Sequence, residues 1–328
     1  MNGELQTYHN QLSQLEQGAL PLAIQTAGDK AKYKFVEFFF STLANSNTRE
    51  AYARASFRFF NWCEQQGLEL AQVHPIAVAG YIRQLEQELS PASVKQHLAA
   101  IRMLFDWFVV EGVTSNNPAS SVKGPKHNPK RGKTPVLTPE DTRRLFDSIE
   151  LKTVKDYRDR AILGVLFYAW VRVSSVCDLD VRDYYHVGRQ TFLKFKEKGG
   201  KEQLVPVHHK AVEYLEAYLE QAQIDSMDKL EKKRSLFRTI DNRRQLTERR
   251  MNRNDVLRMV RSRASKAGIS AEITVHTARA TGITTYLSNG GALEAAQDIA
   301  NHADPRTTRL YDRRKDTIDR AEIERVQY

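Results

Sequence analysis

The stretch that decides the fold runs from Ile273 to Tyr311 and reads ITVHTARATGITTYLSNGGALEAAQDIANHADPRTTRLY. His276 and Arg279 are three residues apart, a spacing that places both side chains on one face of a helix. Such a pair offers a titratable donor and a forked cation to the same anion, which suits a phosphate. His302 then stands nine positions before Tyr311, across a proline-containing turn. Taken alone, the first pattern is more often an ordinary surface helix, and the second is more often ordinary packing.

Two further polar positions lie upstream of this stretch. Arg172 stands among apolar residues in YAWVRVS (168–174), where a buried guanidinium needs an anionic partner. An internal ion pair with Asp178 or Asp180 is the structural alternative. Lys198 directly precedes Gly199-Gly200, at the expected tip of a hairpin. A lysine there is either solvated or held as a proton donor that points into a groove.

The periodicity predicts a mainly α protein with a small β-sheet, an α+β fold. Helices are expected around 35–43, from a capping-box-like start at Asn47 to Gly67, over 75–88, and from Ser90 to Gly112. The second half predicts a helix that starts at Thr138, an apolar helix from Ala161 to about Trp170, a hairpin (Thr191–Lys198 with Lys201–Val207), and helices over 210–222, 252–267, 277–288 and 293–301.

Composition shifts divide the chain into segments. We expect a loosely packed N-terminal extension (1–33), a helical domain (34–120), a linker rich in proline and glycine (121–137), a larger domain (138–311) and a tail (312–328). The linker carries five cations and no acid between Val122 and Thr134, so we expect it to bind DNA as a strap along a phosphate backbone rather than to be a solvated connector. Its basic residues are Lys123, Lys126, Lys130, Arg131 and Lys133.

The charge balance points to a polyanionic partner. Lys and Arg number 50 against 40 Asp and Glu, which gives a formal charge of +10. The segment Lys229–Lys266 alone holds 14 cations and four acids, so we expect it to face DNA rather than only solvent.

Several classes of protein are excluded or disfavoured. No run of 18 apolar residues exists, and residues 1–11 lack the features of a secretory signal. Two distant cysteines, Cys63 and Cys177, exclude a disulfide scaffold or a cysteine-rich zinc site and fit a reducing cytosol. The spacing of the histidines disfavours a metal site. Because no Walker A loop, GxGxxG or GxSxG motif is present, we expect no cofactor and no bound nucleotide.

Taken in order, Arg172, Lys198, the His276–Arg279 pair and the His302–Tyr311 pair resemble the tyrosine recombinase (phage integrase) family, over about residues 34–328. The resemblance implies a helical core-binding domain and a catalytic domain that form a C-shaped clamp around DNA. It also implies that Tyr311 attacks a phosphodiester and forms a 3′-phosphotyrosyl linkage, which a 5′-hydroxyl of the partner strand then attacks. The arginines would hold the phosphate, Lys198 would protonate the leaving oxygen, and either histidine would take the tyrosine proton.

Further properties follow from the same resemblance. The expected partner is double-stranded DNA with paired inverted half-sites, bound by a homotetramer in the synaptic complex and by a chain that is monomeric when free, with a possible accessory directionality factor. The tail would dock on a neighbouring protomer. The expected location is cytoplasmic and nucleoid-associated, in a prokaryote. The expected role is integration or excision of a mobile element, with resolution of chromosome or plasmid dimers as the alternative.

The sequence departs from the family pattern at several positions. Trp170 and Asn301 replace residues that are usually glycine or small, and Ala278 replaces a usual leucine. Ser175 stands where an acid is usual, and Asp178 is a candidate substitute. Lys198 lacks the preceding glycine of the common turn, which makes Lys196 and Lys201 its rivals. Two other functions stay open at this point: a type IB topoisomerase, and a DNA-binding regulator on an inactive recombinase fold.

Overall fold

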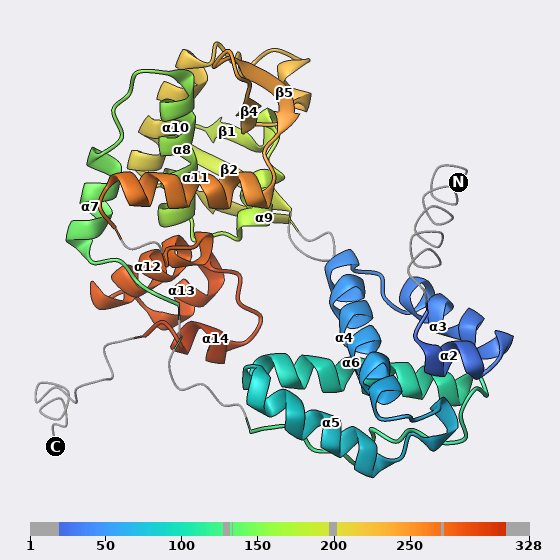
Figure 1. The fold of residues 1–328 in the computed structure, drawn as a ribbon. Coiled ribbons are helices and arrows are strands. Elements are labelled where there is room, and N and C mark those ends of the chain that lie inside the picture. Colours follow the sequence, from blue (N-terminus) through green and yellow to red (C-terminus); the bar gives the residue numbers. More distant parts are fainter. Residues whose placement is uncertain (1–19, 127–131, 133, 197–201, 270–271, 313–328) are drawn as a thin grey trace, which may run out of the picture. The chain divides into compact units, whose positions relative to one another are not determined.

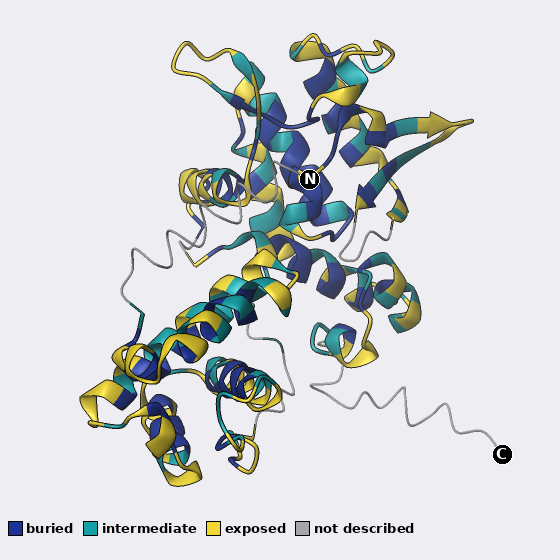
Figure 2. Ribbon diagram, turned by 90° about the vertical axis from the view of Figure 1, so that its right-hand side faces the viewer, coloured by how far each residue is buried: buried dark blue, intermediate teal, exposed yellow. Residues whose placement is uncertain are grey.

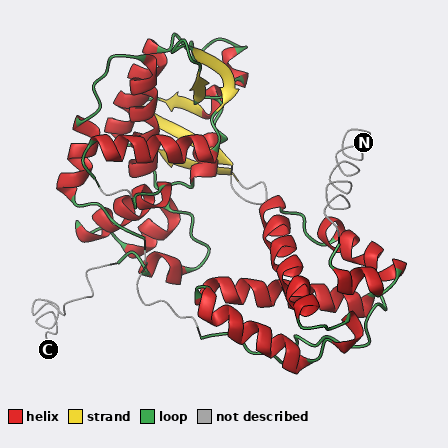
Figure 3. Ribbon diagram, viewed as in Figure 1, coloured by secondary structure: helices red, strands yellow, loops and turns green. Residues whose placement is uncertain are grey.

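The computed structural model describes residues 20–126, 132, 134–196, 202–269 and 272–312. The chain divides into two compact units, Met1–Asn128 and Pro129–Tyr328, and the division falls inside the predicted 121–137 linker. The fold is mainly helical with small antiparallel sheets, so the predicted α+β class is confirmed (Figures 1 and 3). No helix among the described residues is both long and apolar enough to cross a membrane.

The first unit is a bundle of helices around an aromatic core. Its helices are α2 (Leu22–Thr26), α3 (Asp29–Ser41), α4 (Ser46–Gln65), α5 (Pro75–Glu88) and α6 (Pro91–Val110). Phenylalanines at helical spacing on α3, α4 and α6 point inward and pack edge to face, for example Phe35 against Phe39 with ring centroids 5.2 Å apart. Figure 2 shows the buried residues on the sides of these helices that face one another.

Two expectations about this unit are corrected. Residues 20–33 are not a loose extension, because α2 and the start of α3 bury Ala23, Ile24 and Ala31 in the aromatic core. The start of α4 is capped by Asn45 rather than by Asn47. The Asn45 side chain accepts hydrogen bonds from the backbone N–H groups of Asn47 (3.0 Å) and Thr48 (3.1 Å). The predicted helix over 75–88 is confirmed by α5.

The second unit is built on α8 (Val154–Tyr168), whose central residues are almost completely buried. Its neighbour α10 (His209–Gln221) packs closely on it at Gly164. A Cβ atom there would lie 2.9 Å from the Tyr214 ring, so any other residue would displace that ring. The other helices of this unit are α7 (Pro139–Asp147), α9 (Val173–Cys177), α11 (Arg253–Lys266), α12 (Val275–Ser288), α13 (Leu293–Ile299) and α14 (Pro305–Arg309).

An antiparallel three-stranded sheet has the order β1-β2-β3, with β1 (Tyr184–Val187), β2 (Gln190–Lys196) and β3 (Glu202–Pro206). Phe192 pairs with Pro206 and Lys196 with Glu202, which confirms the predicted hairpin. The sequence analysis missed β1 and a second hairpin, β4 (Arg238–Ile240) with β5 (Leu246–Arg250). These strands are too short, and too mixed in composition, to give a period-2 signal.

Helix α8 ends earlier than predicted. It stops at Tyr168, and Trp170 has a positive φ of 51°, so the chain turns there instead of continuing the helix to Trp170. The end of the linker is also anchored in this unit. Leu137 is buried, and its N–H donates to the Thr281 hydroxyl on α12 (3.0 Å).

Candidate active site

Different elements of the second unit supply the predicted site residues. Arg172 is the N-cap residue of α9, where the chain re-enters helix after the turn at Trp170. His276 and Arg279 lie in the first turns of α12, whose start is fixed by a hydrogen bond from the Thr274 N–H to the Thr277 hydroxyl (3.1 Å). His302 follows α13, and Tyr311 follows α14.

Arg279 is the buried hub of this arrangement, with 3% of its surface exposed. One terminal nitrogen donates to the backbone carbonyl of Trp170 and the other to that of Ala300. These carbonyls lie two residues before Arg172 and two before His302. A single guanidinium therefore ties together the turns that present both residues, and it is held in one plane by two bonds.

His302 is buried and held on three sides. Its Nδ1 lies 2.9 Å from the hydroxyl of the fully buried Thr308. Its backbone N–H donates to the Gln297 carbonyl (3.0 Å), and the Gln297 amide donates back to the His302 carbonyl (3.1 Å). The ring stacks on Tyr311 with centroids 5.8 Å apart and planes 8° apart. The imidazole orientation is thus set by the segment that carries Tyr311.

Tyr311 is half-buried at the edge of a small separate core formed by Trp170, Ile283, Leu287, Ala296 and Ala300. Its N–H donates to the Thr308 carbonyl (3.0 Å), and its carbonyl accepts from the Thr284 hydroxyl on α12 (3.1 Å). The backbone around the tyrosine is therefore fixed to the helix that carries His276 and Arg279.

The electrostatics show that these groups converge. Loss of water around the ring, followed by the positive charges of Arg279 and Arg172, lowers the pKa of His276. Burial, and then Arg279, Arg172 and His276, lower the pKa of His302 to about 4. Both imidazoles are therefore neutral at pH 7, beside two permanent cations. Of the six predicted residues, the structure brings together Arg172, His276, Arg279, His302 and Tyr311.

Arg172 differs from the sequence expectation in one respect. Its flanking apolar residues predict a shielded side chain, but the residue is exposed. The exposure arises because Trp170, Val171 and Val176 are buried while the N-cap position between them faces outward. Of the two carboxylates weighed as its partners, Asp178 is exposed and Asp180 binds Arg250 and Arg182.

The predicted lysine and its neighbours are only partly described. Lys198 and Lys201 lie outside the described residues, between β2 and β3 in the sequence. Lys196, the other rival, is the last residue of β2, and its ammonium lies 3.8 Å from a carboxylate oxygen of Asp180. Lys196 is therefore held at the base of the hairpin by an acid that also binds two arginines.

The linker cations divide in the same way. Lys123 and Lys126 are described and exposed, whereas Lys130, Arg131 and Lys133 lie outside the described residues. Residues before Lys123 are not free linker, because Val122 is buried and its carbonyl accepts from Arg102. Gly132 donates its N–H to the carbonyl of Leu310 (3.0 Å), directly beside Tyr311. The linker thus touches the segment that carries the tyrosine.

The expectation that Lys229–Lys266 forms one DNA-facing cationic surface is too simple. Six of its arginines make ion pairs: Arg234, Arg238, Arg249, Arg250, Arg258 and Arg263. Arg263 is buried and binds both Asp156 and Asp159, so part of the charge excess holds the domain together.

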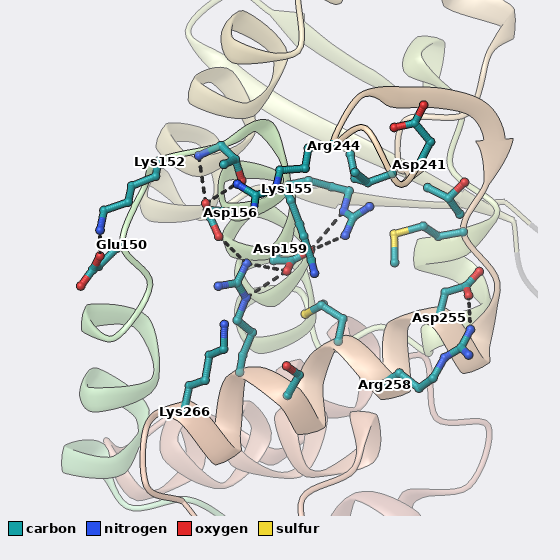
Figure 4. Close-up of a pocket in the computed structure, with 18 of the residues that line it drawn as sticks. Glu150, Lys152, Lys155, Asp156, Asp159, Asp241, Arg244, Asp255, Arg258 and Lys266 are labelled. Atoms are coloured by element: carbon teal, nitrogen blue, oxygen red, sulfur yellow. Dashed lines mark hydrogen bonds and ion pairs between the residues drawn. The ribbon is translucent and has the colours of Figure 1, made fainter.

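A polar cavity of about 960 Å³ lies beside this ion-pair network (Figure 4). Its central bonds join Asp156 and Asp159 of α8 to arginines, and Arg258 pairs with Asp255 at its edge. None of the five converging residues lines it. Both oxygens of Asp156 and of Asp159 have partners, so we assign the network to domain stability. The described residues hold no cluster of three His, Cys, Asp or Glu suited to a metal ion.

Sequence reasoning missed two groups of the site. The first is the Trp170 carbonyl, which no sequence pattern can indicate because every residue has a backbone carbonyl. The tryptophan itself, at a position that is usually small, is the one available signal. Thr308 lies three residues before Tyr311, and only the fold brings its hydroxyl to His302.

Comparison with family models gives two matches. Residues 135–317 match the phage integrase family, and residues 34–112 match the phage integrase N-terminal SAM-like domain.

Curated relatives cover most of the chain. Tyrosine recombinase XerC of Thermodesulfovibrio yellowstonii is 32% identical over 271 residues, 81% of this chain and 85% of the relative. Tyrosine recombinase XerD of Oceanobacillus iheyensis is 30% identical over 71% of this chain and 75% of its own length.

Solved structures share the fold at lower identity. XerH recombinase bound to a palindromic difH substrate, in a post-cleavage complex, has a TM-score of 0.66 at 18% identity over 80% of this chain and 75% of its own. A lambda integrase dimer bound to a COC′ core site has a TM-score of 0.64 at 18% identity, covering 88% of this chain and 78% of its own.

Proposed function

The chain belongs to the phage integrase family and is a tyrosine recombinase, a DNA breaking-and-rejoining enzyme, and from this premise we propose that Tyr311 is its nucleophile in strand exchange between two DNA sites. The observation that carries the proposal is the convergence around Arg279. Its guanidinium holds the turns before Arg172 and His302, and His302 stacks on Tyr311. A tyrosine, two histidines and two arginines thus share one place.

In this proposal the two arginines stabilise charge that develops during attack. As the Tyr311 oxygen adds to phosphorus, the phosphorane gains negative charge on its non-bridging oxygens. Arg172 reaches that charge from the exposed N-cap of α9, and Arg279 reaches it from its buried place on α12. A cation held in position before reaction needs no reorganisation in the transition state.

The proton roles follow from the neutral histidines. A neutral imidazole carries one N–H. With Thr308 beside Nδ1 of His302, a hydroxyl that donates to Nδ1 leaves the proton on Nε2, and an anionic phosphate favours this tautomer. His302 then donates to the phosphate, and His276 takes the proton of Tyr311. Lys198 supplies a proton to the departing 5′-oxygen.

The test is Tyr311→Phe on a nicked suicide substrate. A nick beside the scissile phosphate lets the leaving strand diffuse away, so a covalent protein–DNA adduct accumulates. We expect wild type to form the adduct and Tyr311→Phe to form none while binding DNA nearly as well, because only a hydroxyl is removed. An adduct with the variant would place the nucleophile elsewhere, with half-buried Tyr286 as the next candidate.

We propose double-stranded DNA with paired inverted half-sites as the partner and a tetramer as the active assembly. Support comes from neighbours in fold: one is XerH on a palindromic site, and another is a lambda integrase tetramer bound to a Holliday junction. Strand exchange between two sites on separate duplexes tests this assembly. Relaxation of supercoils without any exchange would instead favour a topoisomerase.

The cellular role stays a prediction. Integration or excision of a mobile element and resolution of chromosome or plasmid dimers use the same chemistry, and the curated relatives bear the names XerC and XerD. A plasmid with two copies of the natural site separates the two uses. Exchange that only resolves multimers favours dimer resolution, whereas joining of a circular element to an unlinked target favours integration.

A further inference from the structure

Trp170 occupies a backbone conformation that disfavours large side chains. Its φ is 51°, in the left-handed region where glycine is the least strained residue. A bulky aromatic residue stays there only when its surroundings offset the strain. The reason for the tryptophan must therefore lie in what its side chain contacts.

The indole of Trp170 lies directly against α12. It is 7% exposed, and a Cβ atom added to Gly282 would stand 2.2 Å from Cδ1 and Nε1 of the indole. Gly282 is three residues after Arg279, so the two share one face of the helix. Trp170 thus contacts that face twice, because its carbonyl accepts from Arg279 and its indole covers Gly282.

The contact continues along the next turn of α12. The Tyr286 ring lies 5.1 Å from the indole, and Gly291 leaves room for that ring, since a Cβ there would come within 2.2 Å of it. Trp170 also packs with Ile283, Leu287, Ala296 and Ala300 in the small core beside which Tyr311 lies. The other buried residues described for this core all come from residues 283–300, so Trp170 joins the turn before Arg172 to this core.

We propose that Trp170 is a positioning residue that sets the spacing of Arg172 and Arg279. The inference rests on the proposed function. The turn at Trp170 sets the direction of the backbone that leads to Arg172, two residues later. The indole packs this turn against the face of α12 that bears Arg279. Two guanidiniums can both hydrogen-bond one phosphate in the transition state only when their separation is fixed to within a fraction of an ångström.

Two substitutions separate the indole from the backbone. Trp170→Gly suits a positive φ, so it keeps the turn and its carbonyl and removes only the indole. Trp170→Phe keeps part of the ring. We expect single-turnover cleavage of a nicked substrate to fall about 10- to 100-fold in Trp170→Gly and less in Trp170→Phe. The dissociation constant for one half-site should change by less than about threefold, since most phosphate contacts remain.

A second substrate distinguishes positioning from loss of stability. A scissile methylphosphonate carries a methyl group in place of one charged oxygen, so its cleavage depends less on a paired guanidinium clamp. The defect of Trp170→Gly should therefore shrink on this substrate. Leu145→Ala, which opens the main core at a fully buried position of α7, is the matched control for destabilisation. It should leave the ratio of the two substrates at the wild-type value.

Each outcome has one meaning. Wild-type cleavage by Trp170→Gly, or an equal defect on both substrates, overturns the inference. Wild-type protein that forms no covalent adduct with either substrate overturns the proposed function instead.

Discussion

Arg172 and Arg279 carry the same charge in opposite surroundings. Arg172 is exposed at a helix N-cap. Arg279 is buried and donates hydrogen bonds to two backbone carbonyls. A role at the phosphate is proposed for both, and Arg279 in addition holds two backbone turns together. The two residues should therefore differ in stability and agree in chemistry.

We predict that Arg172→Ala and Arg279→Ala each lower the cleavage rate by roughly 10²-fold or more, because one transition-state donor contributes about 3 kcal/mol. Arg279→Ala should also lower the melting temperature, since it leaves buried carbonyls unpaired. Arg172→Ala, at an exposed position, should lower the melting temperature less than Arg279→Ala. Single-turnover cleavage and calorimetry measure the two effects. If affinity for DNA fell in proportion to cleavage, the arginines would be anchors rather than transition-state groups.

His302 gives a prediction for pH. Its pKa is about 4 in the folded protein against about 6.5 in an unfolded chain. Above pH 6.5 both states are neutral and stability does not change through this group. Between pH 6.5 and 4 His302 is protonated in the unfolded chain and neutral in the folded chain, so the free energy of unfolding falls as the pH falls.

The melting temperature should consequently drop over this window, and it should drop less steeply in His302→Gln. Other groups, including His276, titrate in both proteins, so the difference between the two curves isolates His302. Parallel curves would contradict the lowered pKa.

At the scale of elements, α12 is the piece on which the site is assembled. It supplies His276 and Arg279 and binds the linker end through Thr281 and the tyrosine segment through Thr284. The linker in turn touches Leu310 through Gly132. The linker, which we propose contacts DNA, is therefore also bonded to the segment that carries the proposed nucleophile.

We predict that charge reversal at Lys126, Lys130 and Arg131 weakens binding to all DNA sequences alike. The slope of log K against log salt should fall by about 0.9 for each phosphate that the linker no longer neutralises. A matched control reverses Lys152, Lys155 and Lys210, which are exposed, lie outside the linker and outside Lys229–Lys266, and change the net charge equally. An equal decrease in both variants would assign the effect to net charge, and an unchanged slope would make the linker a plain connector.

At the scale of the whole molecule, the proposed assembly depends on the tail. Residues 313–328 lie outside the described residues, and the sequence there offers only a ragged apolar face: Ile318, Ala321, Ile323 and Val326. So few apolar residues bury too little surface to fold alone. The resemblance to the family implies docking on a neighbouring protomer.

We predict that truncation after Lys315 leaves binding to one half-site intact and weakens cooperative binding to paired half-sites. Recombination should fall with the cooperativity, because a neighbour would no longer hold the segment next to Tyr311. A gel-shift titration on single and paired half-sites measures both. If the truncated chain fills paired half-sites as cooperatively as the full chain, the tail folds back on its own protomer.

The sequence by itself determined the fold class, the helical first domain and the positions of five residues that converge. These are local or ordered signals: apolar period, Pro and Ser at helix starts, and polar residues in a fixed order along the chain. The sequence-based prediction was wrong where the local pattern and the packing between helices disagree. Residues 20–33 show no clear apolar period, and their apolar side chains, such as Ile24, are buried only because α2 packs on α3 and α4 in the folded unit.

Only the tertiary structure decided how the site is held. That Arg279 is buried and binds the carbonyls of Trp170 and Ala300, that Thr308 meets His302, and that the indole of Trp170 covers Gly282 are contacts between residues up to 112 positions apart. The physical reason is that a backbone carbonyl, or the open side of a glycine, gives no signal in a sequence that tells which group will pack against it. Their use depends on which surfaces the folded chain brings together, and a positive φ at Trp170 becomes visible only there.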